Sequence, residues 1–283
     1  MTIKPHHSEQ VREQVREQAG EHVRDQAAGL RRLFNVRGAR VVALTASTIV
    51  RGRAQLMAGA AAQLAARGHR VLLLDENPAP DNAGRLLDSA GPDLLQVVRA
   101  EASLAQAVDR VNRNLSVLGA ARLANAGLPL TRRIADLFQT LVDGHDLVLI
   151  DCCVAHAGSA SALALQGELV VVVKAESNGI MQAYTQIKKL AQRHHRDRFR
   201  ILVSGTVNRD EARIVFNNLR KVAAEHLGVH LDYLGLAEPE RGDMLADLLD
   251  AGLGRDGVDP REFSGTATAL GLVPELTARH SMV

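Results

Sequence analysis

The amino-acid sequence predicts an α/β fold: a doubly wound, mostly parallel sheet with helices on both faces. From residue 40 onward, short apolar runs rich in Val, Ile and Leu alternate with stretches of helical periodicity. Hydrophobic residues make up 46% of the chain, but aromatic residues only 2%, and Trp is absent. The core must therefore consist of Ala, Leu, Val and Ile, which suits helices packed closely on a sheet that is buried on both faces.

The predicted elements follow one another in strict βα order, which implies right-handed crossovers. The predicted strands are 40–45, 70–75, 115–119, 146–151, 168–174, 199–204 and 229–236. The predicted helices are roughly 53–67, 93–109, 130–142, 179–194 and 209–226. Asp75 and Asp151 end two of these strands, at the sheet edge where such folds bind their ligands.

Composition narrows the class of function. With 34 basic and 32 acidic side chains the formal net charge is +2, so no large field of one sign is expected. The scarcity of aromatic residues argues against a platform for single-stranded nucleic acid. Cys152 and Cys153 are adjacent and form no disulfide framework, and the eleven His lack metal-ligand spacing. These spacings lead us to expect no metal site. No run of about 18 apolar residues occurs, so we expect a cytoplasmic protein.

The first 37 residues differ from the rest. Tetrads of the form Val-Arg-acid-Gln recur at 11–14, 15–18 and 23–26, and they place a thin apolar seam along one side of a helix. Two interpretations remain open: a solvated helix, or a helix that folds against a partner. We therefore expect three parts: a partner-binding segment 1–37, a βα domain 38–250 and a loose tail 251–283.

The segment after the first strand lies where a P-loop would be. A P-loop reads G-x-x-x-x-G-K-[S/T] between a strand and a helix, and its backbone amides, Lys and hydroxyl hold phosphates and magnesium. In TASTIVRGRAQL (45–56), Ser47 falls at the first Gly and Gly52 at the second. Arg53 falls at the Lys, and Ala54 falls at the hydroxyl residue.

With these residues the chain resembles the MinD/ParA family of deviant Walker ATPases, and within it the flagellar-number regulators (FlhG, also called FleN). The resemblance runs over about 21–245 and implies a P-loop NTPase-like fold. The segments that carry it occur in the family's order and spacing: DQAAGLRRL (25–33), GHRVLLLDEN (68–77), DLVLID (146–151), AYTQIKKLA (183–191) and LGVHLDYLG (227–235).

Carried over position by position, the resemblance implies a degenerate nucleotide site. The family's signature Lys corresponds to Thr48, its catalytic Asp to Asn77, and its adenine-reading Asn to Ser204. Asp75 and the magnesium-shell Asp151 remain, although Cys152-Cys153 follows Asp151 in place of Thr-Gly.

We therefore expect a pseudo-ATPase and not an enzyme. The vestigial cofactor site would comprise Gly52, Arg53, Asp75 and Asp151. No cofactor is expected, and weak binding of ATP and magnesium is the most that this site would retain. Each positioned group in such a site typically supplies on the order of 10² to 10³ in rate, so several losses together would stop turnover.

The resemblance also implies a partner. In the family, the segment that matches Asp25, Gln26, Ala27, Leu30 and Arg31 is an activator helix that docks on the signal-recognition-type GTPase FlhF and stimulates GTP hydrolysis. Gln26 and Arg31 are able to orient water or stabilise charge, while Leu30 supplies an apolar contact. The family also restrains a flagellar transcriptional activator and engages the flagellar switch complex, and nothing in the sequence selects among these partners.

We expect no direct binding of nucleic acid or membrane, because the Gly- and Pro-containing stretch 255–283 is unsuited to a long amphipathic helix. Recruitment to the cell pole would then depend on partners. Two alternatives remain open. One is an atypical but active ATPase in which Arg53 replaces Lys, which measurable binding of magnesium-ATP would favour. The other is a degenerate localisation adaptor for another envelope machine, which binding to FlhF would exclude.

Overall fold

The computed structural model describes residues 39–46, 52–126, 131–152, 160–176, 178–238 and 240–253. Three of the sequence-based predictions fall outside these residues. They concern the segment 1–37 with its motif at 25–31, Thr48 in the loop after the first strand, and the tail from 254 onward.

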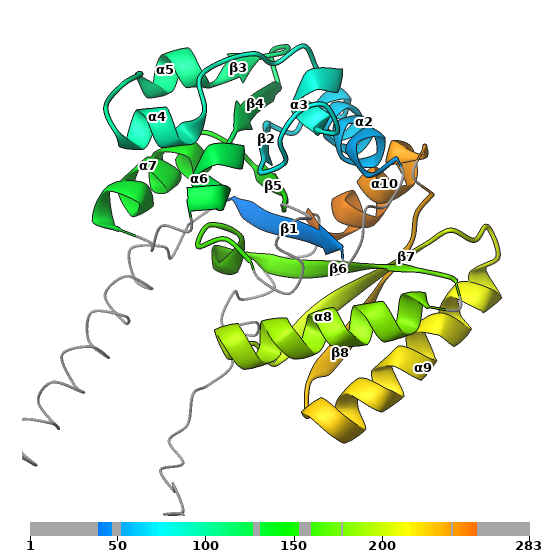
Figure 1. The fold of residues 1–283 in the computed structure, drawn as a ribbon. Helices are drawn as coiled ribbons and strands as arrows, with labels where there is room; N and C mark the ends of the chain where they lie inside the picture. The colour runs from blue at the N-terminus through cyan, green and yellow to red at the C-terminus, as the bar shows by residue number, and fades with distance from the viewer. Residues whose placement is uncertain are drawn as a thin grey trace, which may run out of the picture.

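The protein is built on one eight-stranded sheet with the order β3-β4-β2-β5-β1-β6-β7-β8 (Figure 1). All neighbouring strands are parallel except the short β3, which runs antiparallel to β4. The strands are β1 Arg40–Ala46, β2 Val71–Asp75, β3 Asp109–Arg110, β4 Leu115–Gly119, β5 Leu147–Asp151, β6 Glu168–Lys174, β7 Arg198–Ser204 and β8 His230–Leu236. The predicted α/β fold class is confirmed, and the seven predicted strands agree to within one residue at each end.

Helices cover both faces of the sheet (Figure 1). On one face lie α4 Leu94–Val98, α5 Leu104–Ala107, α6 Ala121–Ala126, α7 Arg132–Asp143, α8 Gly179–His194 and α9 Arg209–Leu227. The 3-10 turn η2 Ala164–Gln166 packs on the same face. On the other face lie α2 Arg53–Ala66, α3 Ala83–Leu86 and α10 Gly242–Leu253.

The central strands explain the two-sided core. In β2, Leu72 and Leu74 point into one apolar cluster, while Val71 and Leu73 point into the other. Successive side chains of a strand face opposite sides, so an unbroken apolar run is what burial on both faces requires. Within the described residues, no helix is long and apolar enough to span a membrane.

The predicted helix 93–109 was wrong, because the chain leaves the helical conformation in its middle. Helix α4 ends at Val98, and Ala100 adopts a left-handed conformation with φ 62°. Ser103 then caps the separate helix α5, and its hydroxyl accepts a hydrogen bond from the backbone of Gln106. A new N-cap inside a stretch of helical periodicity divides it into two helices.

Helix α10 was not predicted, and it runs past the expected domain boundary at 250 to Leu253. It packs on α2 at a close backbone contact: a Cβ on Gly242 would lie 2.5 Å from the carbonyl carbon of Gly59. Arg67, the C-cap of α2, forms ion pairs with Asp247 and Asp250 toward the end of α10. The apolar side of α10 therefore has a partner that only the tertiary fold provides.

Candidate functional site

The carboxyl ends of β2 and β5 bring two acidic side chains together. Asp75 and Asp151 are register partners at the last residues of these strands, and their exposed fractions are 1% and 0%. Strand β1 ends beside β5, and the chain from β1 to α2 returns to the same edge at Gly52 and Arg53. All four residues that the sequence suggested for a vestigial nucleotide site thus lie at one edge of the sheet.

Gly52 has a conformational role at the start of α2. It is the N-cap of the helix, and its φ of 78° lies in the left-handed region, which glycine adopts without steric cost. Its carbonyl accepts the first helical hydrogen bond, from the amide of Leu56 at 2.9 Å. Gly52 thus sets the direction in which the first helical residue, Arg53, leaves the turn.

Arg53 crosses the edge of the sheet and joins three segments. Its guanidinium forms an ion pair with the carboxylate of Asp151 at the end of β5. Its Nη2 also donates a hydrogen bond to the main-chain carbonyl of Asp81 at 3.1 Å, in the loop between β2 and α3. The residue is only 7% exposed. Helix α2, strand β5 and the loop after β2 therefore share one buried cation.

Asp75 organises the loop that follows it. One carboxylate oxygen accepts hydrogen bonds from the backbone amide of Asn77 at 3.0 Å, and the other accepts from the amide of Gly84 at 2.8 Å. The side-chain amide of Asn77 donates to the carbonyl of Asp151 at 2.9 Å and to that of Cys152 at 3.3 Å. Asn77 therefore acts here as a bridge between the ends of β2 and β5.

Glu76 adds a third buried carboxyl group, which the sequence analysis missed. It is 2% exposed, its amide donates to the carbonyl of Asp151 at 3.0 Å, and its carboxylate accepts a hydrogen bond from the hydroxyl of Ser161. The signal available in the sequence was a Glu directly after the Asp that ends β2. Its partner Ser161 lies 85 residues away, and no local pattern indicates that contact.

The environment of Asp151 favours its neutral form. Complete burial is the main cause that raises its pKa, to about 7, because the charged carboxylate loses its hydration. The nearby carboxylates of Asp75 and Glu76 raise it further, while the charge of Arg53 lowers it. Oδ2 of Asp151 accepts no hydrogen bond from any described residue.

Two further positions lie at the carboxyl ends of their strands. Ser204, which the resemblance aligns with an adenine-reading Asn, ends β7 and is 1% exposed, and its hydroxyl has no hydrogen-bond partner within the described ranges. Thr45, near the end of β1, accepts a hydrogen bond from the side-chain amide of Gln186 in α8 at 2.7 Å. In the part of the chain that the structure describes, no three His, Cys, Asp or Glu side chains are placed to hold a metal ion.

Comparison with known proteins places this architecture among the MinD/ParA folds. A chain of the MinC:MinD cell division protein complex of Aquifex aeolicus superposes with a TM-score of 0.54 at 15% identity, over 83% of this chain and all of that chain. A plasmid partition protein from Borrelia burgdorferi gives a TM-score of 0.54 at 12% identity, over 75% of this chain and 99% of that one. Likeness at this level of identity concerns the fold alone.

One comparison concerns the sequence. The antiactivator FleN of Pseudomonas aeruginosa is 26% identical over 219 residues, which cover 73% of this chain and 76% of FleN. No family model matches the chain. The chain thus shares the fold of these MinD and plasmid partition structures and has a distant sequence likeness to an antiactivator.

Replacing Arg53 by Ala should destabilise the protein strongly. Above about pH 7, where Asp151 is ionised, removing Arg53 leaves this carboxylate buried without its counter-charge, which costs about 3 kcal/mol or more. The matched control is Arg67→Ala, which breaks more exposed ion pairs between the C-cap of α2 and α10 and should cost about 1 kcal/mol or less. Urea unfolding monitored by circular dichroism measures both free energies of unfolding, and equal losses would contradict the assigned role of Arg53.

The raised pKa of Asp151 predicts a stability that falls as the pH rises. Between about pH 4 and pH 7 the folded chain holds a proton on Asp151 that the unfolded chain has released, so raising the pH favours unfolding. The free energy of unfolding of the unmodified protein should fall by about 2 kcal/mol more than that of Asp151→Asn between pH 5 and pH 7. This figure follows from about 1.4 kcal/mol for each pKa unit. Urea titrations at several pH values test this, and identical pH slopes in the two proteins would refute it.

Proposed function

We propose that this chain is a non-catalytic regulator of flagellar number or placement that acts by binding other proteins. The flagellar part of the proposal is supported by the distant likeness to FleN, whose name as an antiactivator describes a protein that opposes an activator. The non-catalytic part is supported by the geometry of the site. The two parts rest on different observations and are tested separately.

The observation that carries the proposal is the buried ion pair between Arg53 and Asp151. The resemblance to the MinD/ParA family implies a site for ATP and magnesium at this edge, with the Asp at the end of the corresponding strand in the magnesium shell. Here the described residues do not fit that ion. The carboxylate of Asp151 already contacts an internal cation, and Ala54 has no hydroxyl to offer as a ligand.

A second departure supports the same conclusion. Asn77 takes the place of the family's catalytic Asp, and its amide is engaged with the carbonyls of Asp151 and Cys152. An amide is not a general base, and this one holds two strand ends together. With Thr48 at the family's signature Lys, the groups for metal binding, nucleophile positioning and dimer closure are all changed, and each is worth on the order of 10² to 10³ in rate.

The N-terminal segment would carry the activity toward a partner. Asp25, Gln26, Ala27, Leu30 and Arg31 match the activator motif through which relatives stimulate the GTPase FlhF. A polar side chain supplied in trans to a GTPase can raise its rate by about 10³ to 10⁵. We assign that role to Gln26 or Arg31, and the apolar contact to Leu30. This activity requires neither ATP nor the edge of the sheet.

The other partners follow from the same proposal. A flagellar transcriptional activator and the flagellar switch complex are candidates, and the antiactivator name of the FleN relative favours the first. The protein would act in the cytoplasm and reach the cell pole through its partners, without contacting nucleic acid or lipid directly.

Magnesium-ATP should leave the thermal stability of the protein nearly unchanged. Stabilisation by a ligand follows RT ln(1 + [L]/Kd), so millimolar or weaker binding gives less than about 0.5 kcal/mol at 1 mM ATP. Differential scanning fluorimetry with and without magnesium-ATP measures the shift, and a MinD-type ATPase serves as the positive control. A rise of several degrees would instead support the alternative of an atypical active ATPase.

The full chain, and a synthetic peptide of residues 1–37, should each accelerate GTP hydrolysis by an FlhF-type GTPase. Gln26→Ala should remove most of the acceleration with little loss of binding, whereas Leu30→Asp should abolish binding. Gln14→Ala is the matched control, because Gln14 occupies the same position in an earlier tetrad. Phosphate release and a binding titration give the two readouts. If neither chain nor peptide binds the GTPase, the flagellar mechanism proposed here is wrong.

A further inference from the structure

Strand β8 is the outermost strand at one end of the sheet (Figure 1). It pairs in parallel with β7, and no other strand among the described residues pairs with its second side. The amide of His230 donates to the carbonyl of Asp197, just before β7. Because the backbone groups of successive strand residues point to alternate sides, those of Leu231 and Tyr233 face away from β7. No described residue forms a hydrogen bond with them.

A strand edge with free N–H and C=O groups can accept a further strand. Many proteins block such an edge with a β-bulge, and β8 contains one, because its register with β7 skips Leu234. The bulge follows Tyr233. The regular part of the edge, residues 230–233, therefore remains able to pair.

Three arginines of α9 form a stripe beside this edge. Arg209, Arg213 and Arg220 are exposed, and at about 100° for each helical residue they fall within about 40° of one another around the helix axis. The guanidinium of Arg213 lies over the ring of Tyr233 on β8, 5.3 Å from the ring centroid. The arginine stripe therefore faces the edge strand, whereas α8 contacts α9 from its position over β6.

Aromatic rings hold two of these guanidinium groups. Arg220 lies over the ring of Phe216 at 5.4 Å, and the centroids of Phe216 and Tyr233 are 5.1 Å apart. Stacking restricts a guanidinium but leaves the N–H groups in its plane free to bind a carboxylate. None of the three arginines of the stripe forms an ion pair with a described residue.

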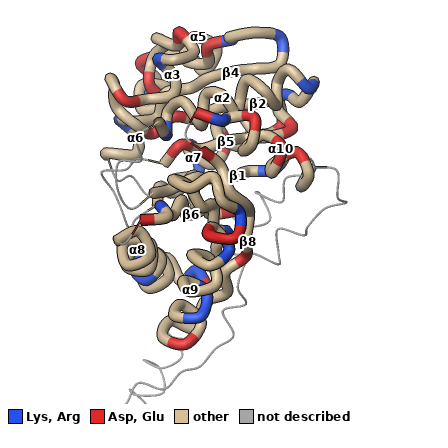
Figure 2. Tube along the Cα trace, turned by 90° about the vertical axis from the view of Figure 1, so that its right-hand side faces the viewer, with Lys and Arg blue, Asp and Glu red and all other residues tan. Residues whose placement is uncertain are grey.

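Helix stability does not explain the arginine stripe. Arg209 is the first residue of α9, where the helix dipole disfavours a cation, and Arg213 is a like charge four residues later. Basic and acidic positions are interspersed over much of the molecule (Figure 2), and α9 also carries Asp210, Glu211 and Glu225. None of these three forms an ion pair with the stripe within the described chain.

We propose that β8 and the arginine stripe together bind an extended acidic segment of a partner protein, which adds a strand to the sheet. The backbone of this segment would pair with Leu231 and Tyr233, and its acidic side chains would contact the stripe. Alternate residues of a strand are about 6.7 Å apart, and the helix rises about 6 Å from Arg209 to Arg213. Acidic residues at every second position of the segment therefore match the stripe.

Other ligands satisfy only one part of this surface. A nucleic-acid backbone or an anionic lipid headgroup would neutralise the arginines, but neither offers the alternating donors and acceptors that a strand edge needs. A second copy of this chain that paired antiparallel through β8 would bring its own arginine stripe against the first, with like charges facing each other. An extended acidic segment satisfies both the edge and the stripe.

The contact should be transient. The regular edge offers about four backbone hydrogen bonds, from the N–H and C=O groups of two residues, so we expect a micromolar dissociation constant that rises with salt. The proposal goes beyond the proposed function above. Strand β8 lies four strands away from β5 in the sheet, and neither Arg53 nor the segment 1–37 takes part.

The test uses the full chain and a fluorescent peptide of about 12 residues in which Glu and Thr alternate, so that all Glu side chains share one face of a strand. Fluorescence anisotropy should give micromolar binding. Arg213→Glu with Arg220→Glu should weaken it at least about ten-fold. Both residues are exposed, and circular dichroism should show unchanged folding.

Two N-methylated peptides test the backbone pairing on the unmodified protein. One carries N-methyl groups on the Glu amides and the other on the Thr amides, so each blocks one edge of the peptide and keeps its charge. The peptide that is blocked on the edge facing β8 should bind at least about ten-fold more weakly. The other should bind within about two-fold of the unmodified peptide, because its methyl groups point away from β8.

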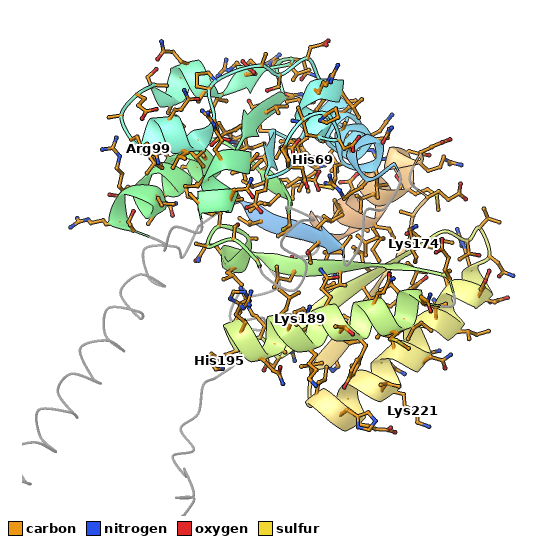
Figure 3. All side chains as sticks on the ribbon, in the orientation of Figure 1. His69, Arg99, Lys174, Lys189, His195 and Lys221 are labelled. Atoms are coloured by element: carbon orange, nitrogen blue, oxygen red, sulfur yellow. The ribbon has the colours of Figure 1, made fainter. Side chains whose placement is uncertain are left out.

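Two control variants separate the stripe from general charge. Arg99→Glu with Arg113→Glu makes the same change of charge at exposed positions and should alter the dissociation constant by less than about two-fold. Figure 3 shows Arg99 on the opposite side of the molecule from Lys221 of α9. Lys221→Glu should have a smaller effect than Arg220→Glu, because Lys221 lies about 100° farther around the helix.

Four outcomes would each overturn the proposal. The first is no binding of the peptide to the full chain, as expected if residues 254–283 or a second copy occupy the edge. The second is an equal effect of both charge-reversal pairs. The third is unchanged binding of both N-methylated peptides, which would leave charge as the only attraction. The fourth is binding of a DNA duplex or of phosphatidylglycerol vesicles through Arg213 and Arg220 while the peptide does not bind.

Discussion

Asp151 is completely buried near two other carboxyl groups, those of Asp75 and Glu76, and a buried carboxylate needs either a counter-charge or a proton. The guanidinium of Arg53 supplies the counter-charge from the first turn of α2. Because the same guanidinium holds the carbonyl of Asp81, the contact also fixes the loop that follows β2. One buried side chain therefore links the first turn of α2, the end of β5 and that loop at the carboxyl edge.

A cation that belongs to the chain differs physically from one that is bound from solution. A bound ion and its nucleotide can leave, and the segments around them can then change conformation, which is how ligand-dependent switches work. Arg53 is covalently part of α2, so the edge is held together without any ligand. In the proposed regulator this arrangement replaces a nucleotide-dependent switch with one constant conformation, and regulation would depend on the abundance and the partners of the protein.

The proposed contacts with partners use parts of the chain that do not depend on that edge. The motif at 25–31 precedes the first strand of the sheet. Loss of ATP chemistry at the edge would thus leave this motif intact.

The sequence by itself determined the order of the strands along the chain and the acidic residues that end β2 and β5. Apolar runs, periodicity and strand-end polar residues are local features, and short-range sterics and burial act on them directly. The prediction of a single helix over 93–109 was wrong because an N-cap inside this stretch divides it into α4 and α5. Helix α10 was not predicted, because its packing partner α2 is distant in the sequence. Only the tertiary structure decided that Arg53 contacts Asp151 and that Glu76 joins them. These arrangements depend on distances between residues far apart in the chain, and those distances are set by how the crossovers pack on the twisted sheet.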